Sequence, residues 1–171
     1  MIIVLLYTMK TLKITHPFWQ VLGIGALAGM RSSAAPVIAS QILSHHQNKR
    51  LDRSPLKFMQ SKRVSKTLMA LAISEVIVDK LPSTPNRIKV AGLIGRGLSG
   101  ALAGASIYKA IGGSAALGAA LGGTTAIAAA FGSFYLRRNT VKKTRIFDPI
   151  IGAIEDALVI GAGAALIKID E

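Results

Sequence analysis

The chain has 171 residues, of which 51% are apolar and 17% are charged, with no cysteine and a formal net charge of +13. Because the mean hydropathy is positive at +0.47, the composition excludes an ordinary soluble domain and a disordered tail, while the absence of cysteine excludes a disulfide framework. One domain is expected at this length, and its apolar residues exceed the needs of a single soluble core, so we expect an integral membrane protein.

Residues 1–16 are expected to be an N-terminal extension that precedes the membrane domain. The apolar run at the start is followed by its positive charges, Lys10 and Lys13. That order is the reverse of a signal peptide's, and the run is too short to span a bilayer. Phe18 and Trp19, which come next, are typical of an anchor at the membrane interface.

Several apolar segments are long enough to cross a hydrocarbon core of about 30 Å at about 1.5 Å per residue. They are residues 18–43, 64–81, 89–111, 114–136 and 147–168. Each is predicted to be helical, because lipid offers no partner to an open strand and the alternation of a β-barrel is absent. The fold class is therefore an all-α integral membrane protein with about five transmembrane helices in a single domain, residues 1–171.

The basic residues lie mainly between the apolar segments, in predicted loops at 44–63 and 137–146. Only Phe58 and Phe147 lie in or beside these loops, so a platform for stacking bases is not evident and no nucleic-acid partner is expected. Basic loops between spans are typical of contact with anionic lipid head groups. Several membrane crossings are expected.

Two topologies are compatible with this charge pattern. With five crossings the two basic loops face opposite sides and the charges divide nearly evenly; if residues 64–81 dip in and return, the loops share a side and four spans remain. We prefer five crossings, because lysine side chains can extend the reach of that segment. A loose inverted repeat, with residues 25–40 aligned on 118–133, supports the same choice, since a basic loop and an acid-bearing helix follow each copy.

Small residues recur four apart in three of the predicted helices. Such spacing lets helix backbones approach closely where no hydrophobic effect drives association. The predicted packing positions are Gly25 with Gly29, Gly100 with Gly104, and Gly118 with Gly122.

Charged side chains also lie within or at the ends of the apolar segments. They are Arg31, Glu75, Asp79, Arg96, Glu155 and Asp156. A charge near the bilayer centre costs at least about 2.5 to 3.5 kcal/mol, so these groups are expected to face the bundle and find partners.

Two interpretations of the buried charges remain open. In the first they line a polar path, with Glu75 and Glu155 as exchangeable acids and Arg31 and Arg96 as their partners or as anion contacts. Arg31 lies between Gly29 and Pro36, where a helix break would place free backbone groups beside the guanidinium and suit an anion; a plain kinked helix is equally allowed. In the second they form ion pairs that fix the register of the helices.

The first interpretation predicts a small transporter or channel for an ion or polar solute, and the second a scaffold or lipid-contacting subunit. No catalytic arrangement stands out, so we expect no enzyme activity and no cofactor. His45 and His46 lack a third ligand, so we expect no metal site. A homodimer is one option for a chain this small.

Several short motifs together resemble a family of small bacterial integral membrane proteins known as a domain of unknown function. They are Gly29-Met30-Arg31-Ser32, Glu75-x-x-x-Asp79-Lys80-x-Pro82, Gly100-Ala101-Leu102-x-Gly104-Ala105, and Asp148-Pro149 with Glu155-Asp156. The resemblance covers about residues 20–165 and implies a bacterial protein with several spans, expected in the inner membrane, without implying an activity. Many members have Gly-x-Asn-Ala-Tyr at the first motif, so a role for Arg31 does not carry over from the family.

Overall fold

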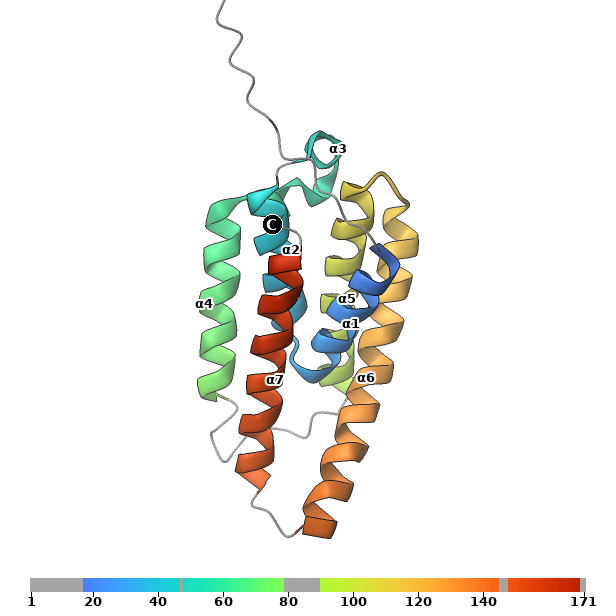
Figure 1. Ribbon diagram of the computed structural model, residues 1–171. Helices are drawn as coiled ribbons and strands as arrows, with labels where there is room; N and C mark the ends of the chain where they lie inside the picture. Colours follow the sequence, from blue (N-terminus) through green and yellow to red (C-terminus); the bar gives the residue numbers. More distant parts are fainter. Residues whose placement is uncertain (1–16, 47, 79–89, 145–147, 170–171) are drawn as a thin grey trace, which may run out of the picture.

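The computed structural model describes residues 17–46, 48–78, 90–144 and 148–169, and these are helical apart from short turns (Figure 1). The elements are α1 (Pro17–Met30), α2 (Ala34–His45), α3 (Lys49–Asp52), the 3-10 helix η1 (Pro55–Gln60), α4 (Lys62–Val78), α5 (Val90–Ala110), α6 (Ala115–Thr144) and α7 (Asp148–Ile169). No strand occurs among these residues, so the all-helical class is confirmed for them. The extension expected at 1–16 lies outside the described residues.

The long helices α4, α5, α6 and α7 surround the shorter pair α1 and α2 (Figure 1). Fully buried apolar side chains from the inner pair, such as Ile24 and Ile42, share a core with Ile107 of α5. α5 and the segment Ala115–Val141 of α6 are long and apolar enough to cross a membrane. The inner pair is therefore enclosed by the long helices.

The prediction of one helix over residues 18–43 is wrong, because the helix is interrupted between α1 and α2. Pro36 has no N–H to donate, and its ring would clash with the carbonyl of Ser32 in an unbroken helix. Arg31 N still donates to Leu27 O at 2.8 Å, after which Ala34 N donates to Arg31 O at 3.2 Å. Pro36 instead lies in the first turn of α2, where the backbone donors have no helical partner in any case.

The two short helices form a hairpin whose turn lies part-way along the bundle (Figure 1). We call its turn, residues Arg31–Ser33, the apex. The other ends of α1 and α2 both lie toward the end of the molecule that carries α3. This hairpin differs from both topologies expected from the sequence, since the segment that turns back is the first and not residues 64–81.

The two regions expected as basic loops contain regular structure. Within 44–63 the chain forms α3 and η1, which are capped where Asn48 Oδ1 accepts from Arg50 N at 3.0 Å and Ser54 Oγ accepts from Leu56 N at 3.3 Å. α6 continues to Thr144, so most of the expected loop at 137–146 is helical. The first region and the end of α6 lie at opposite ends of the bundle (Figure 1).

The glycines expected at packing positions lie where helix backbones approach one another. A Cβ atom at Gly100 or Gly104 of α5 would collide with the carbonyl oxygen of Gly122 or Gly118 of α6, respectively. A Cβ atom at Gly25 of α1 would lie 2.8 Å from Gly122 O. The pairing makes α5 and α6 antiparallel, and only glycine leaves room for this separation.

Candidate functional site

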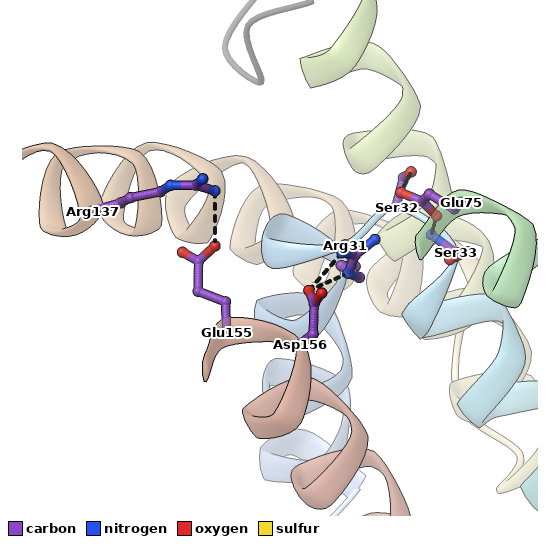
Figure 2. Close-up of polar contacts among 7 residues, drawn as sticks. All are labelled: Arg31, Ser32, Ser33, Glu75, Arg137, Glu155 and Asp156. Carbon is purple, nitrogen blue, oxygen red and sulfur yellow. Dashed lines mark hydrogen bonds and ion pairs between the residues drawn. The ribbon is translucent and has the colours of Figure 1, made fainter. Parts of the chain in front are cut away.

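The apex of the hairpin is the place where polar side chains from several helices converge (Figure 2). Among the described residues, those with hydrogen bonds to it include Glu75 of α4, Ser99 of α5 and Asp156 of α7. The remaining long helix, α6, contacts Gly29 at the end of α1. The two pack so closely that a Cβ atom on Gly29 would collide with Ala126 O and the Cβ of Ala129. All four long helices therefore contact residues 29–33.

Arg31 forms a buried ion pair with Asp156. Its Nε lies 2.7 Å and its Nη2 2.5 Å from Oδ1 of the carboxylate, and Arg31 is only 7% exposed. Figure 2 shows the guanidinium reaching from the apex toward α7. The pair joins residues that the sequence singled out separately, and its charge-assisted hydrogen bonds fix the orientation of the guanidinium.

Glu75 binds the N-terminus of α2 through both carboxylate oxygens. Ser33 N donates to Oε2 at 3.1 Å, and Ser32 Oγ donates to Oε1 at 2.8 Å. Ser33 occupies the N-cap position of α2 and makes no cap with its own side chain. A carboxylate from α4 thus supplies the acceptor and the negative charge that this helix end favours.

The carbonyl oxygen of Ser32 accepts a hydrogen bond from Ser99 Oγ of α5. In an unbroken helix this carbonyl would clash with the ring of Pro36. A buried backbone carbonyl without a partner is costly, so this bond stabilises the break. Sequence reasoning missed Ser99. The available signal was a hydroxyl three residues after Arg96, on the same face of a predicted apolar helix.

Arg96 is the second buried arginine and is 8% exposed. Its Nη1 lies 3.5 Å from Gly92 O, one turn earlier in α5. Gly100, one turn later, packs against α6. Arg96 thus lies beside the close α5–α6 contact, and its expected role as a partner of a buried acid stays a prediction.

Glu155 does not share the partner of its neighbour Asp156. Its Oε2 lies 3.4 Å from Nη1 of Arg137 in α6, and Figure 2 shows this pair apart from the apex. Adjacent residues of a helix point about 100° apart, which accounts for the separation. Arg137 was assigned to a basic loop from the sequence, and it is the first residue after the predicted span at 114–136. Asp79 lies outside the described residues.

The comparisons with known proteins show a family. Residues 19–169 match the family model described as Domain of unknown function (DUF4126). This match covers most of the chain, and the chain therefore belongs to that family. No curated protein and no solved structure matches the chain.

Proposed function

We propose that this member of the family is a multi-pass protein of the bacterial inner membrane, in which α4, α5, α6 and α7 cross the bilayer and the α1–α2 hairpin is re-entrant. In this role it carries a small ion or polar solute past the apex. A small anion fits the apex best among such solutes. The observation that carries the proposal is a charged apex enclosed by helices whose outward side chains are apolar.

Large apolar side chains on each of the long helices point away from the bundle. Ile73 of α4 is 58% exposed, Leu98 of α5 66%, Leu136 of α6 70% and Ile160 of α7 67%. Arg31, by contrast, is buried. A soluble protein has the opposite distribution, whereas a bilayer solvates the apolar exterior and forces charged groups inward.

Helix lengths support the same assignment. At about 1.5 Å per residue, the 21 residues of α5, 30 of α6 and 22 of α7 reach or exceed a hydrocarbon core of about 30 Å. The 17 residues of α4 are at the lower limit. The 14 residues of α1 and 12 of α2 are each too short to cross, which favours a re-entrant hairpin. Irregular backbone is tolerated at membrane depth only inside protein or beside a water-filled cavity.

The apex suggests how a solute and a proton would be coupled. Transporters commonly place the N-terminus of a broken helix against an anionic group of the substrate. Here the carboxylate of Glu75 occupies the N-terminus of α2. Protonation of Glu75 would remove its charge and release Ser33 N–H and Ser32 O–H, so that a small anion could replace it near Arg31. Proton and anion would then cross together without net charge.

Flux measurements on liposomes test this proposal. The purified chain is inserted into vesicles of phosphatidylethanolamine and phosphatidylglycerol that contain a pH-sensitive dye, and an inward gradient of chloride, nitrate or phosphate is imposed. We expect at least one of these anions to acidify the interior faster than in protein-free vesicles. Glu75→Gln cannot exchange a proton, so its rate should fall to that of protein-free vesicles.

Asp52→Asn is the matched control, because it removes one carboxylate from an exposed site in α3, which lies at the end of the bundle and not at the apex (Figure 1). We expect this variant to keep the wild-type rate. Unchanged flux in Glu75→Gln, or no acidification with any of the anions, contradicts proton–anion transport.

A scaffold is the alternative, and one observation favours it: the charges of Arg31 and Asp156 already satisfy each other at 2.5 Å. If the apex only holds the helices together, Glu75→Gln should unfold in detergent. A folded variant that has lost flux favours transport, and an unfolded variant favours the scaffold.

A further inference from the structure

α3 lies at one end of the bundle (Figure 1), and the segment from α3 to the start of α4 is rich in basic residues. The basic side chains between residues 48 and 66 are all exposed, and Asp52 is the only acid among them. We call this set the basic platform. It consists of Lys49, Arg50, Arg53, Lys57, Lys62, Arg63 and Lys66.

The basic platform is fixed to the bundle and is not a loose loop. Leu51 and Met59 are fully buried in the core. Ser40 Oγ of α2 donates to Met59 O at 2.9 Å, and Arg50 Nη1 donates to Ile111 O at 2.5 Å. These contacts fix the backbone that carries the cations, so little backbone entropy is lost when a ligand binds there.

Among the residues that the structure describes in α3, η1 and the first turn of α4, Asp52 is the only acid. Asp52 lies 3.7 Å from Lys57, and both side chains are at least half exposed. The first turn of α4 contains Lys62 and Arg63 and no acidic residue. Cations are disfavoured at a helix N-terminus, where the helix dipole is positive. Anions from outside the chain would relieve this repulsion.

Exposed aromatic side chains lie toward the same end. Phe58 of η1 is 45% exposed, and at the start of α1 Phe18 and Trp19 are 44% and 68% exposed. The rings of Phe18 and Trp19 pack edge to face with centroids 5.4 Å apart. Aromatic residues of this kind favour the head-group level of a bilayer, which would put the basic platform at the depth of the lipid phosphates.

We propose that the basic platform binds the head groups of anionic phospholipids in the leaflet at this end of the bundle. The inference rests on the membrane placement proposed above and not on transport. Charge complementarity favours lipid, since each Lys or Arg near an anionic leaflet contributes to attraction. Phe58 is the one aromatic residue between residues 48 and 66, which disfavours nucleic acid because bases would need several stacking partners.

Lipid titration of the full chain in neutral detergent tests the inference. Native mass spectrometry counts bound phosphatidylglycerol or phosphatidylcholine for wild type and for the triple variant Arg53→Gln, Lys57→Gln, Arg63→Gln. We expect wild type to prefer phosphatidylglycerol, and the triple variant to bind it with roughly fivefold lower affinity for each charge removed. Binding of phosphatidylcholine should not change.

Two further variants separate charge from other effects. A triple variant that keeps the charges should bind phosphatidylglycerol like wild type. Its substitutions are Arg53→Lys, Lys57→Arg and Arg63→Lys. A second triple variant removes the same number of charges from the sequence at the end of α6 and should keep most of the lipid preference. Its substitutions are Arg138→Gln, Lys142→Gln and Lys143→Gln. Equal loss in this variant overturns the assignment to the basic platform. So does stronger binding of a single-stranded RNA oligonucleotide than of phosphatidylglycerol at physiological salt.

The inference stays testable if the triple variant does not fold. The single variants Arg53→Gln and Lys57→Gln change exposed side chains and should each show about fivefold weaker phosphatidylglycerol binding. Because the readout is lipid binding and not flux, loss of transport in Glu75→Gln leaves this result unaffected. Wild-type affinity in both single variants contradicts the inference.

Discussion

The ion pair between Arg31 and Asp156 ties the apex to α7. Both short contacts go to the same carboxylate oxygen, at 2.7 Å from Nε and 2.5 Å from Nη2. A buried pair contributes its attraction only while both members are present, because removal of one leaves the other charged and poorly solvated. The pair therefore constrains the apex, whereas the longer pair of Glu155 and Arg137, at 3.4 Å, lies apart from it (Figure 2).

Substitution of Asp156 tests this difference. Asp156→Asn removes the carboxylate charge that Arg31 contacts at 2.5 Å inside the bundle and should lower the free energy of unfolding by about 3–5 kcal/mol. Glu155→Gln, at the neighbouring position, should cost less than about 1 kcal/mol, because its 3.4 Å pair is longer and nearer the surface. Denaturant titration in mixed micelles, followed by circular dichroism, measures both. Equal losses in the two variants would contradict the central role of Asp156.

The charged residues at the apex were easier to predict from the sequence than the pairs that they form. Arg31, Glu75 and Asp156 stand out as charges in apolar segments, because burial makes such charges costly. Arg31 and Asp156 are 125 residues apart, and no spacing rule connects positions so distant. Ser99 was missed for a different reason, since a serine in an apolar helix carries no charge and satisfies itself on many helices.

At the level of the elements, Pro36 decides the form of the first segment. Hydropathy alone cannot distinguish a crossing helix from a hairpin, since both need the same apolar residues. A helix break near Arg31 is compatible with the sequence, yet the length of the apolar segment 18–43 predicts one crossing. The reversal depends on partners for the freed backbone groups, and these come from α4 and α5, far away in the sequence. Residues 49–60 were predicted to be a loop because they are mostly polar, although they form α3 and η1.

The close contact between α5 and α6 predicts a position-dependent effect of adding one methyl group. Gly104→Ala would place a Cβ atom against Gly118 O, so helix separation must increase and stability should fall by about 1–3 kcal/mol. Gly95→Ala, in the same helix, meets nothing within 4 Å and should be neutral or stabilise by up to about 1 kcal/mol. Thermal unfolding in detergent measures both changes. A lower midpoint for Gly95→Ala than for Gly104→Ala would refute the close packing.

For the whole molecule, the structure does not support the inverted repeat. Gly25 lies against Gly122, and Gly29 lies against Ala126, so α1 and α6 run in the same direction. Equivalent helices of an inverted repeat should run in opposite directions. The alignment also sets Pro36 opposite Ala129, which keeps its N–H and allows α6 to continue unbroken. The two segments therefore share an apolar composition without sharing a fold.

Topology is the remaining property of the whole molecule, and the absence of cysteine makes it measurable. We expect cysteines introduced at Phe18 and Ser54 to react on one side of the membrane and a cysteine at Asn139 to react on the other, because the hairpin returns to its starting side. A crossing of residues 18–43 would instead group Phe18 with Asn139. Labelling intact cells with an impermeant maleimide, and permeabilised cells as the control for accessibility, distinguishes these patterns. If all three positions react equally in intact cells, α4, α5 and α6 do not cross as proposed.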